Sequence, residues 1–324
     1  MKKWKGIFWL CLVVVSLLLL SACGSSDSNA SGDQGGSNDA TPQASDDGGS
    51  KGRVVVGGKD FTEQQILSKI TSIYLKEKGY DVEEVGSMGS AVVRSALENG
   101  QIDVYWEYTG TALVIYLEQE AESDPELAYN IVKETDEANG LVWMDKADFN
   151  NTYAILMRRD RAEELGIQTI SELAAFVNEQ PNELTFATNA EFSSREDGLP
   201  GLQAAYGFEF PSSKVIRMDS GLLYNALRDN QVDVSVGFAT DGRIKGFDLV
   251  VLEDDQLFFP AYNAVPVIRQ AVLEENEELA ELLNTLADHL DTETMVELNY
   301  TVDVEHKDVT EVAREWLKSA GLID

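Results

Sequence analysis

The sequence is poor in cysteine and histidine. Its 324 residues contain two cysteines, Cys11 and Cys23, and two histidines, His289 and His306. No cysteine follows residue 23, so we expect a folded body without a disulfide or a thiolate metal site. Two histidines with no evident partner ligands also give no basis for a zinc cluster or a histidine-based triad. The sequence therefore predicts neither a metal nor a cofactor.

Basic residues are scarce as well. Lysine and arginine number 25 against 57 aspartates and glutamates, and the formal net charge is -32. A surface this acidic repels phosphate backbones, which argues against nucleic-acid binding, and it offers no basic patch for anionic lipid. With 44% hydrophobic residues and about 300 residues beyond the N-terminus, the chain is long enough for two domains.

The motifs of common catalytic sites are also missing. The sequence contains no GxxxxGK[ST] loop, no GxGxxG after a strand, no GxSxG elbow and no HExxH. Acidic residues are so numerous that a pair of carboxylates is a weak sign of acid–base catalysis, because a solvated surface is the better explanation for them. We therefore expect a protein that is not an enzyme.

What the sequence does have begins with a leader. Residues 1–22 combine a basic start with an apolar run over residues 7–20, which is short for a membrane span. Residues 20–23 read LSAC, which resembles a bacterial lipobox and predicts lipidation of Cys23. Residues 23–52 are rich in Gly, Ser and Asp and predict a flexible tether. We expect a lipid anchor at the extracytoplasmic face of the cell membrane; an ordinary secretory signal or an uncleaved anchor are the alternatives.

The body alternates strand-like and helix-like segments. Strands are predicted at residues 53–57, 80–85 and 102–106, and helices begin near residues 62 and 90. TEQQ at residues 62–65 has the pattern of a capping box. This rhythm predicts an α/β fold with a largely parallel sheet and helices on both faces.

A weak internal repeat indicates two similar lobes. ALENGQIDV at residues 96–104 matches ALRDNQVDV at residues 226–234 with an offset of 130, and the two copies lead to Tyr108 and Phe238. DFTE at residues 60–63 resembles EFSS at residues 191–194, although general βα grammar could produce either echo. We assign residues 53–151 and 268–324 to lobe one and residues 152–267 to lobe two. Strand-like runs at 152–157 and 262–268 mark the two crossings, and a ligand cleft is expected where strands end.

Four aromatic residues fall at these strand ends or crossings. They are Tyr108, Tyr153, Phe238 and Tyr262. A box of ring faces attracts a soft cation that cannot donate hydrogen bonds, such as a quaternary ammonium group. A single ring of this kind more often fills the core, whereas four together at predicted cleft positions favour the box.

Two cations follow the first strand of each predicted lobe. Lys59 and Arg195 could hold the carboxylate of a ligand, Arg195 through two parallel hydrogen bonds. The alternative for each is a salt bridge to a nearby acidic residue.

Several segments together resemble one family, the glycine betaine/choline/carnitine substrate-binding proteins of osmoprotectant ABC transporters. The resemblance extends over residues 53–324. The segments that carry it are GKDFTEQ (58–64), WEYTGT (106–111), NTYA (151–154), REDGLPGL (195–202), FATDGR (238–243) and FPAYN (259–263).

The resemblance implies a two-lobed periplasmic-binding-protein fold of type II, with two crossover strands and a ligand cleft between the lobes. It implies an aromatic box on Tyr108, Tyr153, Phe238 and Tyr262, and carboxylate contacts from Lys59, Thr111 and Arg195. Some members have tyrosine at position 238 or lack the lysine at 59. Choline-selective members tend to have aspartate at 111. Threonine there, and an Arg195 that choline would leave unpaired, predict a preference for betaine.

The function implied is that of a receptor. A monomer would capture a quaternary-ammonium compatible solute, such as glycine betaine, carnitine or choline, and deliver it to the permease of an ABC importer. A receptor for another polar cationic solute, such as an amino acid, is the alternative within this class. An extracellular enzyme on the same scaffold and a structural lipoprotein are the alternatives outside it.

Overall fold

The computed structural model describes residues 50–324. The predicted signal peptide, the lipidation site Cys23 and most of the predicted tether lie outside the described residues. None of the helices formed by residues 50–324 combines the length and apolar character that a membrane span needs.

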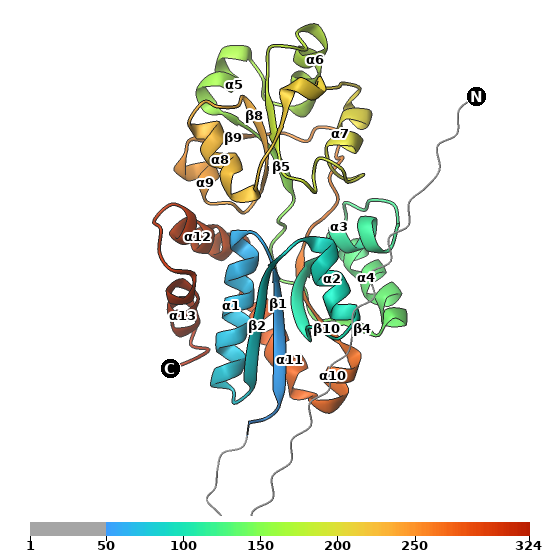
Figure 1. The fold of residues 1–324 in the computed structure, drawn as a ribbon, viewed down its shortest axis with the longest axis vertical. Helices are drawn as coiled ribbons and strands as arrows, with labels where there is room; N and C mark the ends of the chain where they lie inside the picture. Colours follow the sequence, from blue (N-terminus) through green and yellow to red (C-terminus); the bar gives the residue numbers. More distant parts are fainter. Residues whose placement is uncertain (1–49) are drawn as a thin grey trace, which may run out of the picture. The chain divides into compact units, whose positions relative to one another are not determined.

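The first sheet contains five strands and defines lobe one. The strands are β1 (Arg53–Lys59), β2 (Asp81–Met88), β3 (Val104–Tyr108), β4 (Leu141–Trp143) and β10 (Ala264–Arg269). Their order across the sheet is β2-β1-β3-β10-β4. β1 pairs in parallel with β2 and β3, whereas β10 runs antiparallel to both β3 and β4. A strand from the late part of the sequence therefore lies among early strands (Figure 1).

Helices cover both faces of this sheet because valine side chains alternate along β1. Val54 and Val56 belong to one core cluster with residues of the first helix, and Val55 belongs to a second cluster with residues of the next helix. The helical segments of lobe one are α1 (Thr62–Glu77), α2 (Ser90–Glu98), α3 (Thr109–Thr111), η1 (Ala112–Tyr116), α4 (Pro125–Asp136), η2 (Glu137–Asn139), α10 (Gln270–Glu275), α11 (Glu278–Asp288), α12 (Thr292–Asp303) and α13 (Val309–Ser319).

The second sheet defines lobe two and has the same plan. Its strands are β5 (Tyr153–Arg158), β6 (Phe186–Thr188), β7 (Val215–Arg217), β8 (Val234–Phe238) and β9 (Leu249–Leu252), in the order β7-β6-β8-β5-β9. β5 is antiparallel to β8 and β9, as β10 is to β3 and β4. The helical segments are α5 (Arg159–Leu165), α6 (Ile170–Glu179), α7 (Leu199–Tyr206), η3 (Ser212–Lys214), α8 (Ser220–Arg228) and α9 (Arg243–Gly246).

The two lobes correspond in detail at the offset seen in the sequence. The Asp103 carboxylate accepts a hydrogen bond from the backbone N–H of Val55 at 2.8 Å, and Asp233 accepts one from Thr185 at 2.9 Å. Each aspartate ties the start of one strand to its neighbour. Val92 in α2 and Leu222 in α8, also 130 positions apart, are 59% and 54% exposed. The predicted two-lobed α/β fold is confirmed, and the repeat belongs to the folded structure.

Two sequence predictions need correction. The boundary of lobe two at residue 267 is too late, because β10 begins at Ala264 and pairs with β3 in the first sheet. The TEQQ segment does not form a capping box. Phe61, not Thr62, is the N-cap of α1 and makes no side-chain cap, and the Thr62 hydroxyl donates to Asp303 at 2.7 Å instead.

Candidate functional site

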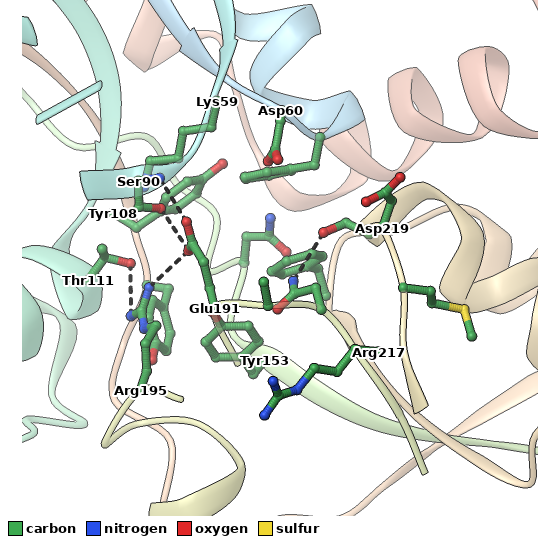
Figure 2. Close-up of a pocket in the computed structure, with 18 residues that line it drawn as sticks. Lys59, Asp60, Ser90, Tyr108, Thr111, Tyr153, Glu191, Arg195, Arg217 and Asp219 are labelled. Carbon is green, nitrogen blue, oxygen red and sulfur yellow. Dashed lines mark hydrogen bonds and ion pairs between the residues drawn. The ribbon is translucent and has the colours of Figure 1, made fainter. Parts of the chain in front are cut away.

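A cavity of about 300 Å³ is lined by residues from both lobes. All seven residues predicted to contact a ligand line it: Lys59, Tyr108, Thr111, Tyr153, Arg195, Phe238 and Tyr262. They come from the ends of β1, β3 and β8, the start of β5, α3, and the loops before α7 and β10. Figure 2 shows several of these side chains directed into the same space. Strand ends from two equivalent sheets meet here, which is where ligands of α/β folds bind.

The aromatic side chains form one connected wall. The Tyr153 ring centroid is 5.4 Å from that of Phe238 and 5.4 Å from that of Tyr262. Phe61, which the sequence reasoning did not select, stacks on Phe238 at 5.0 Å and lies 6.1 Å from Tyr108. The signal was present, because Phe61 stands inside the DFTE echo directly after β1. Such a wall can hold a methylated cation by dispersion and cation–π attraction.

Arg195 is already paired within the protein. Its Nε donates to Asp197 at 2.7 Å, and a second nitrogen donates to the other oxygen of the same carboxylate. Asp197 also accepts the hydroxyl of Tyr262, and Arg195 lies 3.4 Å from the Thr111 hydroxyl. The expectation that choline would leave Arg195 unpaired is therefore wrong. Asp197 neutralises the guanidinium with or without a ligand carboxylate. The argument that the protein prefers betaine to choline therefore loses its main support.

Lys59 is paired as well, and more deeply. Its Nζ lies 2.5 Å from the Glu107 carboxylate, and both side chains are almost fully buried. The same ammonium group sits 5.1 Å from the ring centroid of Tyr108. The salt bridge that the sequence left open as an alternative is formed, although Lys59 still lines the cavity.

The lobes also touch each other at the cavity. The Glu191 carboxylate of lobe two accepts hydrogen bonds from the backbone N–H of Ser90 at 2.8 Å and from its hydroxyl at 3.0 Å (Figure 2). Ser90 begins α2, so an anion here interacts favourably with the positive end of that helix. Sequence reasoning missed both residues, because their contact joins segments about one hundred positions apart.

Further polar residues on the cavity wall were also missed. Arg217 lies apart from Arg195 in Figure 2, and among residues 50–324 it is the one arginine without an ion pair to a carboxylate. The remaining polar lining residues are Asp60, Asn151, Asn189, Asp219 and Ser220. Burial, followed by the charge of Glu191, raises the pKa of Asp60. The wall therefore carries carboxylates and cationic side chains in equal number, which suits a zwitterionic ligand.

Next to the aromatic wall lies a buried carboxylate, that of Glu63, which lines a second, smaller cavity together with Phe61 and Phe238. It accepts hydrogen bonds from Tyr108 Oη at 2.7 Å and Asn151 Nδ2 at 2.8 Å, and from the hydroxyl of Thr240. Burial raises the pKa of Glu63, and its hydrogen bonds act in the opposite direction. Burial and the nearby Glu63 hold the pKa of the Tyr108 phenol well above its usual value, so this hydroxyl stays protonated and donates.

No group of three or more His, Cys, Asp or Glu side chains in the described part of the chain is arranged to hold a metal ion. The polar groups of the cavity are instead hydroxyls, amides, carboxylates, an ammonium group and guanidinium groups around aromatic rings. Two lobes of equal topology with a cavity of this composition between them are typical of the substrate-binding proteins of transporters.

Comparison with known proteins makes the assignment more specific. Residues 52–319 match the family described as the substrate binding domain of ABC-type glycine betaine transport systems. The chain belongs to this family, which consists of solute-binding transport proteins.

Named relatives agree with that assignment. The chain is 43% identical over 274 residues to a glycine-betaine-binding protein of Pseudomonas aeruginosa, with 83% of this chain and 88% of that protein covered. It is 37% identical over 276 residues to the carnitine transport binding protein OpuCC of Listeria monocytogenes, with 84% and 88% covered. Among solved structures, a glycine betaine/carnitine/choline ABC transporter protein aligns with a TM-score of 0.67 at 31% identity, covering 84% of this chain and all of the other.

Proposed function

We propose that this protein binds a small quaternary-ammonium solute in the cavity between its lobes and delivers it to the permease of an ABC importer for osmoprotection. Glycine betaine and related betaines are the first candidates, with carnitine and choline also within reach. The observation that carries the proposal is the convergence of Tyr108, Tyr153, Phe238 and Tyr262 on one cavity that also holds the Arg195–Asp197 pair.

The chemistry of the wall supports a cation without N–H donors. Ring faces offer it about 0.5–2 kcal/mol each through cation–π attraction, whereas a primary ammonium would also need hydrogen-bond acceptors at fixed positions. Arg195 and the Thr111 hydroxyl stand close together and are suited to a carboxylate at the other end of the ligand. The names of the relatives, a glycine-betaine-binding and a carnitine-binding protein, support the same ligand class.

A calorimetric titration tests the proposal. The protein should be titrated with glycine betaine, proline betaine, carnitine, choline and proline, and thermal shifts should rise with the concentration of each true ligand. We expect the quaternary compounds to bind more tightly than proline. Binding of amino acids without any quaternary compound would replace the proposal with the amino-acid receptor alternative. Recovery of a chemically altered ligand would favour an enzyme instead.

We further propose a monomer that is anchored by a lipid on Cys23 at the extracytoplasmic face, after removal of residues 1–22. The basic leader, the apolar run and LSAC support this proposal. Cys23→Ala should move the protein from the membrane fraction to a soluble or uncleaved pool in cell fractionation. A cleaved alanine variant that still sediments with membranes would contradict lipid anchoring.

A further inference from the structure

Glu63 differs from every other buried carboxylate in the described part of the chain. It is 2% exposed and has no lysine, arginine or histidine within ion-pair distance. The other buried carboxylates each pair with a cation: Asp103 with Arg269, Glu107 with Lys59, Asp136 with Arg94, Asp197 with Arg195 and Asp241 with Arg243. A buried charge without a counter-ion is costly, so its retention calls for a reason.

The hydrogen bonds around Glu63 suit the ionised form. Asn151 and Asn299 present amide nitrogens to it, at 2.8 and 3.3 Å. Their orientations are set by second contacts, because the Asn151 oxygen accepts from the Thr240 N–H and the Asn299 nitrogen donates to the Thr240 carbonyl. An amide N–H can only donate, so the carboxylate is the acceptor in both contacts.

Tyr108 must also donate to Glu63. The Tyr108 oxygen accepts a hydrogen bond from Gln64 Nε2 at 3.1 Å, which leaves its own proton for the Glu63 carboxylate 2.7 Å away. Tyr108 is also one of the residues that line the cavity. The Glu63 carboxylate is therefore coupled to a residue of the aromatic wall through the phenol hydroxyl.

The charges nearest to Tyr108 do not cancel. The Lys59 ammonium lies close to the same ring, but Glu107 neutralises it at 2.5 Å. The Glu63 charge remains, in a buried setting where electrostatic interactions are screened less than in water. In its ionised form, Glu63 gives the lobe-one side of the cavity an excess negative charge.

We propose that Glu63 is the counter-ion for the cationic head group of the ligand. It acts on the head group through the hydroxyl of Tyr108. Glu63 is a positioning residue in this role and does not touch the ligand. A phenol that donates to a carboxylate has a more electron-rich ring, and the anion behind it adds direct attraction for a cation in front. The inference rests on the proposed function and extends it to a residue that selects for positive charge.

The test compares glycine betaine with 3,3-dimethylbutanoate, in which an uncharged carbon replaces the ammonium nitrogen. Glu63→Gln keeps the size of the side chain and an acceptor for Tyr108 but removes the charge. We expect this variant to bind glycine betaine about tenfold more weakly or worse. Its affinity for the uncharged analogue should change by less than about threefold, because that ligand has no head-group charge. Calorimetry, or competition where binding is weak, gives both constants.

Glu63 also contacts Thr240 of lobe two, so a purely structural role needs its own control. Thr240→Val removes that hydrogen bond and leaves the charge in place. If Glu63 only joins the lobes, Thr240→Val and Glu63→Gln will weaken glycine betaine to the same extent, and the inference is overturned. This comparison decides the question even if the uncharged analogue binds too weakly to measure. Thermal melting of each variant identifies any that fail to fold.

A double-mutant cycle tests the route through the phenol. Tyr108→Phe keeps the ring and removes the hydroxyl that meets Glu63. In that background, Glu63→Gln should cost clearly less affinity for glycine betaine than it does in the parent. Equal losses in both backgrounds would overturn the part played by Tyr108. If the parent binds no quaternary ammonium compound at all, the proposed function itself fails, which is a different result from any of these.

Discussion

The two lobes share a strand order and differ in the charges they bring to the cavity. Tyr108 ends β3 of lobe one, and Phe238 ends β8 of lobe two at the equivalent position. The Tyr108 hydroxyl meets the buried Glu63, whereas the Phe238 ring has no hydroxyl and stacks on Phe61. The shared fold of the two lobes thus places Tyr108 and Phe238 at equivalent positions, and of these two rings only Tyr108 contacts a buried carboxylate.

Lobe two supplies a different polar group. Its Arg195–Asp197 pair lies beside Thr111 of lobe one, and Asp197 also accepts the Tyr262 hydroxyl. Under the proposed function, the excess negative charge near Tyr108 would face the ammonium end of a zwitterion, and Arg195 would face the carboxylate end. The equivalent strand order thus provides the same geometry twice, while different side chains in the two lobes make the two ends of the cavity unlike.

The largest expected effect concerns the charge of lobe two. Arg195→Ala should weaken glycine betaine by about 2–4 kcal/mol, because the variant loses a carboxylate partner and leaves Asp197 buried without its cation. Choline has no carboxylate and should lose less. Titration of both ligands measures the difference.

Arg195→Lys serves as the matched control for that prediction. It keeps the positive charge but loses the fork that meets Asp197 with two nitrogens, so its effect should be intermediate. An equal loss for betaine and choline in the alanine variant would mean that Arg195 supports the structure without recognising the carboxylate.

A smaller effect is expected from removing the equivalent rings. Tyr108→Ala should cost about 1–3 kcal/mol of glycine betaine binding, from lost cation–π attraction and lost burial. Phe238→Ala should cost less, about 1 kcal/mol, because Phe238 is partly exposed and Phe61 still offers a ring beside it. Calorimetric titration of both variants provides the comparison. Equal losses of affinity in the two variants would show that the hydrogen bond between Tyr108 and Glu63 does not strengthen glycine betaine binding.

The smallest effect is expected from making the two ring positions alike. Phe238→Tyr adds a hydroxyl at a partly exposed position and keeps the ring face, so glycine betaine binding should change by less than about 0.5 kcal/mol. Tyr108→Phe, with its buried hydroxyl and two hydrogen-bond partners, is the contrasting control. A tenfold loss in Phe238→Tyr would indicate that this position is more tightly enclosed than its exposure suggests.

The positions of the site residues were largely predictable from sequence. Valine-rich strands, helical periodicity and the offset of 130 place Tyr108 and Phe238 at strand ends, and family resemblance adds Thr111. The residues that were missed, Ser90 and Glu191 among them, act through contacts across the lobes. No local pattern signals such a contact, because its partners are brought together only when two separately folded sheets meet.

Two predictions were wrong because a local sequence pattern does not show contacts with residues far along the chain. TEQQ reads as a capping box, yet Thr62 bonds Asp303 in α12 and Glu63 is enclosed by Tyr108, Asn151, Thr240 and Asn299. The second lobe boundary was placed late for a related reason. A buried strand such as β10 looks the same in sequence whichever sheet it joins.

The class of fold, the repeat of the lobes and the ring positions could be predicted without coordinates, because they follow from side-chain periodicity and from segments adjacent in the chain. Which charged side chains have a counter-ion became clear from the folded structure alone. Lys59 and Arg195 look alike as candidate cations, and both prove to be paired, while Glu63 proves to be a buried carboxylate without a counter-ion. Whether a charge has a counter-ion depends on distances of a few ångströms between remote segments, which are set when the lobes pack.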